Sequence, residues 1–377
     1  MASGWLPTNF SASLALALLS MCCWGSWSNS SKAASASDVA FGHYYLDFSL
    51  GVWASTLLLF VTLGGASPWH DSPVDGASRI AAASCAGLVF NVANVLLVAG
   101  IQVAGLAVAF PVGIGTALVL GTLLTFAVDP HNNSAPLFFA GVAAAFAAIL
   151  LQVAADGERE RDRRPPAGAP PPASPRADAD ADGLECPADE SRQALTTDAP
   201  PPPIAAGRQA GLAICATSGL LMALWSPLSA IAMRQEANGR CNGCLTPYGS
   251  MLMLTSAVLV SSPPICALLL RRPIVGAASS LGAYCALPAT AHLYGLAGGA
   301  TWAVGTCSNL ISGASLGFAL SYAIGQAAPM VATLWGLFYY REFAGAGRKC
   351  FLLVASSMTM YSAAIALVAS SKGGSQT

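Results

Sequence analysis

Charged residues are scarce in this chain: Asp, Glu, Lys and Arg make up 9% of its 377 residues. A soluble globular protein carries roughly 25% charged residues, so this deficit excludes an ordinary water-soluble domain. Residues 80–128 and 273–340 contain none of these four residue types. Each of these segments is long enough for two membrane-spanning helices of about 20 residues. The net charge of −1 gives no indication of a nucleic-acid partner.

Residue clusters of the kind that build metal centres and enzyme active sites are also missing. The 4 His are scattered, no GxxxxGK[ST] loop occurs, and no nucleophile–base set stands out. We therefore expect neither an enzyme nor a bound metal or cofactor. Cys241 and Cys244 form a lone CxxC in a short polar loop, where a local disulfide and two free thiols remain alternatives.

Long apolar stretches dominate the chain instead, and they predict an all-α integral membrane protein with ten transmembrane helices. The alternating polarity of a membrane β-barrel is not seen in these stretches. The predicted spans are residues 10–29, 46–66, 80–99, 104–127, 135–155, 209–233, 247–270, 288–307, 314–339 and 349–370.

A polar segment at 156–208 separates five predicted spans from five others. It holds 11 of the 24 prolines and 18 of the 35 charged residues, so it predicts a disordered linker. The chain then divides into 1–155 and 209–371, each a five-helix repeat. An odd number of spans gives the two repeats opposite orientations. Outside the linker, Lys and Arg slightly favour a cytosolic linker in a multi-pass protein of the plasma membrane or an endomembrane.

Two parts of the chain resemble each other across this division. Residues 105–126 and 317–338 align without a gap at an offset of 212. A second, weaker similarity aligns Trp24 with Trp225 and Ser28 with Ser229. Repeated halves that meet at a central site are common in secondary transporters. The matched positions of the first pair are Gly105/Gly317, Ala107/Ala319, Phe110/Tyr322, Gly113/Gly325, Val119/Val331 and Phe126/Phe338.

Substrate recognition in such a chain has to come from aromatic rings and neutral polar groups. Trp24 and Trp225 are candidates for stacking a planar ligand, with membrane-interface anchoring as the alternative. Asparagines within the spans either bind amide groups of a ligand or form hydrogen bonds between helices. Gln326, which stands where the first copy has Ile114, is the strongest polar candidate. The candidate substrate-binding residues are Trp24, Ser28, Asn91, Asn94, Thr116, Trp225, Ser229, Asn309, Tyr322, Gln326 and Trp335.

Proton coupling needs an ionisable group in or near a span. Asp47 at the start of the second span and Glu342 after the ninth are the candidates, although Asp47 could be a surface acid and Glu342 could pair with Arg341. His292 is a weaker proton carrier.

Backbone flexibility is expected in the two repeated helices. Pro111 and Pro329 each remove a backbone hydrogen bond, while Gly113 and Gly325 permit close helix packing. These four residues are candidates for a gating kink, with a passive kink and tight packing as the alternatives.

Several motifs resemble the plant ureide permeases of the drug/metabolite transporter superfamily. They are WGSW in the first span, YLDFS at the start of the second, the Gly/Pro-rich fourth helix, and GQAAPMVATLWGLFYYREF in the ninth. The resemblance implies ten helices in two inverted repeats and proton-coupled import of oxo-heterocycles such as allantoin, uracil and xanthine. The family's nucleotide-binding-like motif is absent from this linker, so we carry over no nucleotide binding.

The leading hypothesis is a secondary transporter for these heterocycles, working by alternating access. A sugar or nucleotide-sugar carrier of the same superfamily is the alternative, and a non-transporting membrane scaffold is a third class. The expected partners are a small-molecule substrate, protons and the lipid bilayer, with homodimerisation left open.

Overall fold

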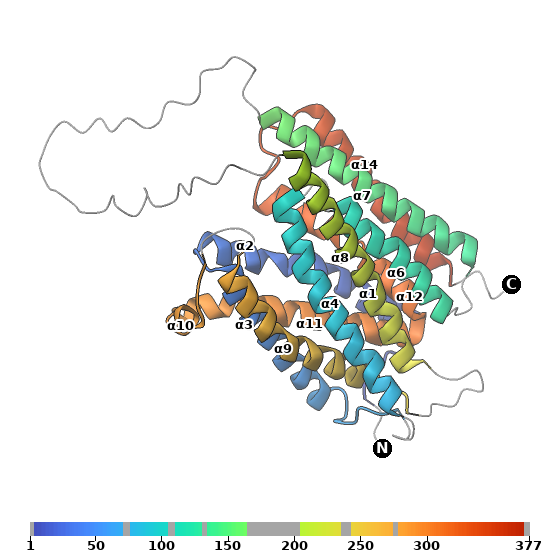
Figure 1. The fold of residues 1–377 in the computed structure, drawn as a ribbon. Helices are drawn as coiled ribbons and strands as arrows, with labels where there is room; N and C mark the ends of the chain where they lie inside the picture. The colour runs from blue at the N-terminus through green and yellow to red at the C-terminus, as the bar shows by residue number, and fades with distance from the viewer. Residues whose placement is uncertain are drawn as a thin grey trace, which may run out of the picture.

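The computed structural model describes residues 4–70, 76–104, 110–129, 134–163, 204–234, 243–273 and 278–372, which are predominantly helical (Figure 1). Before the linker lie α1 (Phe10–Ser26), α2 (Ser28–Ala36), α3 (Phe41–Thr62), α4 (Gly76–Ala104), the π-helical η1 (Phe110–Ile114), α6 (Gly115–Val128) and α7 (Ala135–Arg163). After it lie α8 (Ile204–Met233), α9 (Pro247–Arg271), α10 (Leu281–Cys285), α11 (Ala289–Leu316), α12 (Phe318–Gly325), α13 (Ala328–Leu334), the π-helical η3 (Trp335–Tyr339) and α14 (Arg348–Ser370).

Seven helical segments within the described residues are long and apolar enough to cross a membrane, and a shorter apolar helix spans Val112–Val128. The chain is therefore an all-helical, multi-pass integral membrane protein, as its sequence predicts. The predicted eighth span corresponds to α11, which carries many small and polar residues on its buried face. The predicted ninth span is divided into α12, α13 and η3.

Local sequence explains several of the helix ends. Asn9 caps α1 by accepting a hydrogen bond from the backbone N–H of Ala12 at 2.7 Å, and Thr246 caps α9 through Gly249 in the same way. α11 ends where Gly317 adopts a φ of 99°, a conformation that favours glycine. The break between the eighth and ninth helices therefore falls at Gly317, later than the predicted break after residue 307.

Two further boundaries differ from the predicted ones. α3 begins at Phe41 rather than at residue 46, which places Asp47 inside the helix instead of at its start. α7 continues past residue 155 to Arg163 because its last turns are held by α14: Glu158 pairs with Lys349 at 2.8 Å, and Asp162 accepts from the backbone N–H of Gly347 at 2.7 Å.

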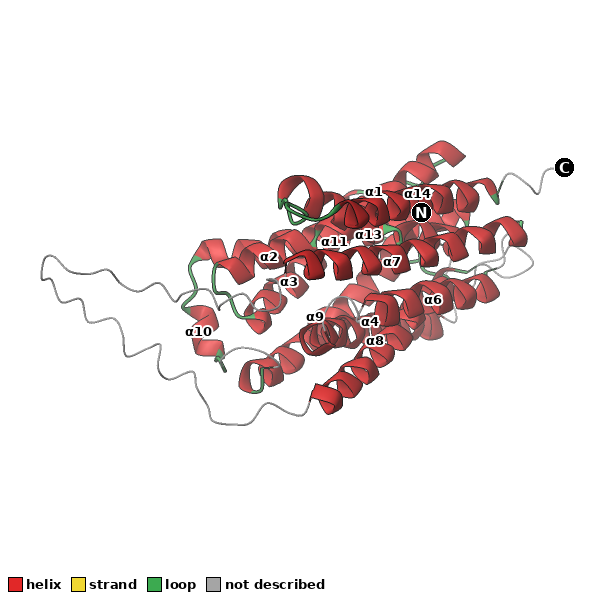
Figure 2. Cartoon of the chain, turned by 90° about the horizontal axis from the view of Figure 1, so that it is seen from above, coloured by secondary structure: helices red, strands yellow, loops and turns green. Residues whose placement is uncertain are grey.

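The helices form two groups that face each other. Figure 2 shows α4, α6, α8 and α9 together, with α1, α7, α11 and α14 across from them. Small residues allow the close packing: a Cβ on Gly299 would lie 2.2 Å from the carbonyl oxygen of Phe48, and one on Gly87 would lie 2.1 Å from that of Leu254. Such contacts are typical of helix pairs in membranes, where dispersion replaces the hydrophobic effect.

Two corresponding helix pairs run antiparallel. At one end of the α7–α14 pair, the backbone N–H of Ser134 donates to Ser371, and at the other end the thiol of Cys350 donates to the carbonyl of Ala155. In the α3–α9 pair, the start of α3 at Gly42 packs on Leu270 near the end of α9. α7 is thus antiparallel to α14, and α3 to α9.

Candidate functional site

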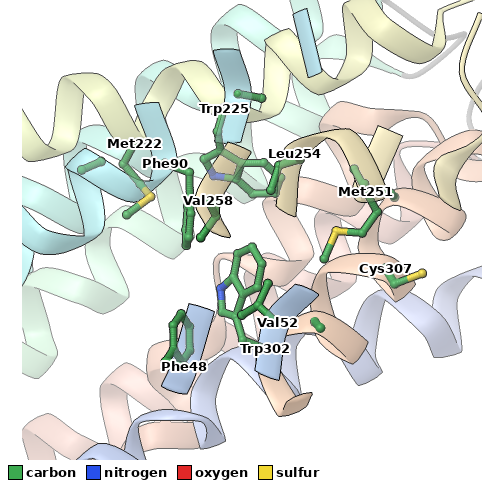
Figure 3. Packing of buried hydrophobic residues seen from close by; sticks show 14 of the residues in the cluster. Phe48, Val52, Phe90, Met222, Trp225, Met251, Leu254, Val258, Trp302 and Cys307 are labelled. Atoms are coloured by element: carbon green, nitrogen blue, oxygen red, sulfur yellow. The ribbon is translucent and has the colours of Figure 1, made fainter. Parts of the chain in front are cut away.

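Five aromatic rings from five helices meet in the middle of the bundle, and we call them the aromatic layer: Trp24, Phe90, Trp225, Trp302 and Tyr322. Trp225 touches Trp24 and Tyr322 edge to face, with centroids 5.7 and 5.6 Å apart. Phe90 lies 4.5 Å from Trp302, centroid to centroid. Figure 3 shows Phe90 and Trp225 on one side and Trp302 facing them from the other. The two helix groups therefore meet through aromatic faces and edges.

Polar groups adjoin the aromatic layer around Trp24. Its indole Nε1 donates to Oγ1 of Thr306 at 3.0 Å, and a Cβ on Gly325 would lie 2.6 Å from the Trp24 ring. Asn309 ties α11 to α12 by donating to the carbonyl of Ser321 at 2.9 Å. Because Gly325 has no Cβ, it also leaves room for the Asn309 amide. Trp24, Asn309 and Gly325 are thus brought together, as a shared site requires.

Sequence reasoning missed Thr306. The residue is buried on α11, and threonine in a membrane helix usually bonds its own backbone, so its residue type alone does not distinguish it. A pattern that could have identified it is its position three residues before Asn309 on the same helix face.

The remaining polar candidates lie at different distances from this cluster. Gln326 follows α12 directly and is partly exposed. Ser229 is buried on α8, but its hydroxyl donates to the carbonyl of Trp225 at 2.8 Å. Thr116 on α6 packs beside Gly219 of α8, and Ser28 is partly exposed at the first turn of α2. Trp335 is 37% exposed and donates to Ser26, so it lies at the edge of the bundle rather than in the aromatic layer.

Asn91 and Asn94 belong to a buried polar network between α3, α4 and α9. The hydroxyl of Tyr45 donates to Oδ1 of Asn91 at 2.8 Å and accepts from Nδ2 of Asn94 at 3.1 Å. Nδ2 of Asn91 donates to Ser261 at 2.8 Å and to Ser262 at 3.1 Å. The Asn91 amide is therefore fully used by protein partners, an arrangement that favours helix–helix bonding over ligand binding.

Asp47 is 2% exposed and lies between three helices. Its Oδ1 accepts from the hydroxyl of Tyr284 on α10 at 2.6 Å, and its Oδ2 lies 2.9 Å from Nδ1 of His292 on α11. His43 contacts the same group, since its ring lies 5.7 Å from that of Tyr284. A buried carboxylate bonded to an imidazole is a group that can hold or release a proton. The partners of Asp47 could not be read from the sequence.

Glu342 occupies the turn after η3 and contacts two cations. It pairs with Lys32 of α2 and Arg159 of α7, each at 2.9 Å, rather than with the neighbouring Arg341. Burial raises the pKa of Glu342, but the hydrogen bonds and positive charges of Lys32 and Arg159 outweigh it, so the pKa lies below its ordinary value. This carboxylate is ionised at neutral pH and acts as part of an ion-pair cluster.

The predicted kink residues lie at irregular points of the two repeated helices. Pro111 is within the π-helical turn η1, and Pro329 is in the first turn of α13, after the break at residues 326–327. The carbonyl of Gly113 lies 2.7 Å from the ideal Cβ position of Gly219 on α8, so η1 and α8 approach closely. Both proline-containing segments therefore depart from a continuous α-helix.

The CNGC loop is only partly described. Cys244 is disulfide-bonded, and its backbone carbonyl accepts from the N–H of His70 at 3.0 Å. Cys241, the predicted partner, lies outside the described residues.

The two repeated helices touch directly. The Tyr322 hydroxyl donates to the carbonyl of Ala117 at 3.2 Å, and a Cβ on Gly121 would lie 2.7 Å from the same hydroxyl oxygen. Positions from the two copies thus line one contact in the middle of the protein.

Comparisons with known proteins indicate membrane transport for this multi-pass helical bundle. The family model described as ureide permease matches residues 205–371. Ureide permease 4 of Arabidopsis thaliana is 23% identical over 391 residues, covering 94% of this chain and 96% of the relative. Ureide permease 5 of the same plant is 21% identical over 402 residues, covering 96% and 94%.

These matches identify a membrane transporter and not an enzyme. The chain is similar to the ureide permease family, as the sequence motifs predicted.

Proposed function

We propose that this protein is a secondary active transporter for small uncharged ureides and oxo-heterocycles of the allantoin, uracil or xanthine type. The observation that carries the proposal is the aromatic layer, whose rings come from both helix groups and adjoin few polar groups. Planar neutral solutes suit such a site, because rings supply stacking while the side-chain amides of Asn309 and Gln326 supply hydrogen bonds. The names of the plant relatives support the same substrate class.

The proposed architecture is ten spans arranged as two inverted five-helix repeats, 1–155 and 209–371, joined by the linker 156–208. The helix packing supports it. The third span α4 packs on the sixth, α8, and the eighth, α11, packs on the first, α1. The second span α3 packs on the eighth, and the seventh, α9, packs on the third. Adding five to each span number converts one pairing into the other, as a two-fold repeat requires.

Substrate is proposed to bind where Trp24 and Trp225 approach each other. Their rings touch edge to face at 77°, so a planar ligand needs the two helix groups to separate slightly before it can stack. Thr306 is added to the candidate residues as the group that orients the Trp24 indole. Asn91 and Asn94 are assigned to holding α3, α4 and α9 together.

Proton coupling is proposed for Asp47 together with His292. The carboxylate is buried, its two oxygens have separate partners, and His292 keeps 26% of its side chain exposed. A proton arriving at His292 therefore has a direct contact to Asp47. Glu342 is less suited to this role, because two cations keep it ionised.

The linker is proposed to be cytosolic. Lys32, Arg159, Arg161 and Lys349 gather at the end of the bundle where α7 leads into the linker, in agreement with the positive-inside rule. The protein would then lie in the plasma membrane or an endomembrane with Cys244 on the opposite side.

Uptake into proteoliposomes tests the proposal. We expect the purified protein to accumulate radiolabelled allantoin or uracil, and to do so more strongly when the inside is made alkaline. Glucose uptake without uptake of either heterocycle would contradict the proposal.

The Asp47→Asn variant tests coupling separately. It should bind substrate yet fail to accumulate it against a gradient, since the titratable group is gone. Glu342→Gln is the matched control, because it neutralises a carboxylate outside the proposed coupling site. Unchanged accumulation by Asp47→Asn would remove Asp47 from the coupling role.

A further inference from the structure

The repeated helices touch at one end and separate toward the other. α6 packs on α12, where the Tyr322 ring fits over Gly121 and the backbone N–H of Phe318 lies 3.4 Å from Oδ2 of Asp129. Toward the other end, η1 packs on α8, α6 and α7, whereas α13 packs on α1, α14 and η3. Within the described residues, close helix packing of one copy on the other is therefore found between α6 and α12, at the end that carries Asp129.

Glycine at position 121 makes this closure possible. Tyr322 is fully buried, and an added Cβ at Gly121 would lie 2.7 Å from its hydroxyl oxygen and 2.9 Å from its ring. Trp225 covers the other side of the Tyr322 ring at a centroid distance of 5.6 Å. The ring thus fills the space between α6, α8 and α12.

Both π-helical turns lie at the separated end. η1 lies near the start of the first copy and η3 lies at the end of the second. Because α6 and α12 run antiparallel, these two turns fall on the same side. π-helical turns interrupt regular hydrogen bonding and frequently occur at functional sites. The end at which the copies pack less closely thus also carries both π-helical turns.

The alignment of the two copies at an offset of 212 pairs each residue of this contact with a residue of the other copy. Tyr322 aligns with Phe110, the first residue of η1, while Ala117 and Gly121 align with Pro329 and Thr333 on α13. A transporter built from inverted repeats reaches its opposite state when the two repeats exchange conformations. In the opposite state, the contact of Tyr322 with Gly121 would then be replaced by a contact of position 110 with position 333.

We propose that the contact of Tyr322 with Gly121 and Ala117 forms a closed gate at the Asp129 end. During transport this gate opens, and a second gate closes where η1 meets α13. This proposal rests on the alternating access of the proposed function. Opening one gate frees Tyr322 from α6, and closing the other brings position 110 to Pro329 and Thr333. Alternating access requires that the two gates are never open together, so one gate must close before the other opens.

Paired cysteines test the exchange in the full-length protein. One variant carries Gly121→Cys with Tyr322→Cys, and the other carries Phe110→Cys with Thr333→Cys. Both are made in a background in which the exposed free cysteines Cys22, Cys85 and Cys285 are replaced by alanine. A short bifunctional thiol reagent is used, since the Tyr322 ring spans the gap in the native protein.

The two cross-linking yields should change in opposite directions when allantoin, uracil or pH is varied. Ala155→Cys beside the native Cys350 is the matched control, because it joins α7 to α14, which the exchange leaves in contact. Its yield should stay constant. Yields that rise and fall together at both gates, or no cross-link between positions 110 and 333 under any condition, would overturn the proposal.

The wedge variant Gly121→Val offers a second test, which does not need cysteine pairs at the gate. It should hold the Asp129 end open and increase labelling of a Ser315→Cys reporter near that end by an impermeant thiol reagent. Unchanged labelling in a folded variant would contradict the gate. Opposite yield changes with pH in a protein that transports no heterocycle would uphold the gate and reject the proposed substrate.

Discussion

The indole Nε1 of Trp24 donates a hydrogen bond of 3.0 Å to Oγ1 of Thr306, and this bond joins α1 to α11 beside the aromatic layer. Trp24 also lies against Trp225 and the backbone of Gly325, so its ring contacts α8 and α12. One side chain of the first helix thus reaches three helices from the second part of the chain. Its orientation controls the space that a planar substrate would enter.

Replacing Thr306 by Val should weaken substrate binding, and replacing Trp24 by Phe should weaken it more. Both changes remove the same hydrogen bond, at an expected loss of about 1 kcal/mol, or about fivefold in affinity, and Trp24→Phe also shortens the ring that is proposed to stack the substrate. The double variant should lose no more than Trp24→Phe alone. Equilibrium binding of labelled allantoin measures this cycle, and additive losses would show that the two residues act independently.

Gly325→Ala should be far more damaging than its single methyl group implies. The new Cβ would lie 2.6 Å from the Trp24 ring and 2.9 Å from the Asn309 amide, forcing apart α1, α11 and α12. Overpacking of this kind costs about 1–3 kcal/mol. The matched control is Gly157→Ala on α7, where an added Cβ meets nothing within 4 Å. We expect Gly325→Ala to unfold at a lower temperature in detergent and to transport more slowly than Gly157→Ala. Equal unfolding temperatures and equal uptake rates would contradict close packing at Gly325.

Much of this fold follows from the amino-acid sequence, because the bilayer imposes length and apolarity on every spanning helix. The helix positions and the membrane class were predictable for that reason. Boundaries failed where tertiary contacts decided them: α7 extends to Arg163 because Glu158 and Asp162 bind α14, and α11 runs on to Leu316 because only Gly317 breaks it.

The candidate site was less predictable, since a sequence shows residue types but not their partners. Trp24, Asn309 and Gly325 were recognised and do meet. Asn91 was an equally good candidate by type, yet Tyr45, Ser261 and Ser262 saturate its amide. Those partners come from helices more than forty residues away in either direction, and periodicity carries no information about them.

Asn91→Ala should reduce stability more than substrate affinity. The substitution leaves the Tyr45 hydroxyl and two serine hydroxyls without their shared partner, at an expected cost of about 1–3 kcal/mol. Asn94→Ala removes a single bond to Tyr45 and should cost about 0.6 kcal/mol, typical of one interhelical hydrogen bond in a membrane. Thermal unfolding ranks the two variants, and binding of labelled uracil shows whether affinity changes. A large loss of affinity at unchanged stability would return Asn91 to the substrate site.

The pH dependence of transport should come from Asp47 and not from Glu342. Lys32 and Arg159 lower the pKa of Glu342 despite its partial burial. A carboxylate with a lowered pKa stabilises the folded state above its ordinary pKa of about 4.3, and this stabilisation is lost only as the pH falls through the lowered value. Between about pH 5 and 8 the ion-pair cluster is therefore constant.

Glu342→Gln should accordingly lower thermal stability at neutral pH but leave the shape of the pH profile of uptake unchanged. Its stability deficit should shrink in acid, where the wild-type carboxylate also becomes neutral. Asp47→Asn should instead flatten the profile, because the carboxylate beside His292 that is proposed to couple transport to protons is replaced by an amide. Initial rates of allantoin uptake between about pH 5 and 8 distinguish the two variants. A flattened profile for Glu342→Gln, with a wild-type profile for Asp47→Asn, would assign coupling to the ion-pair cluster.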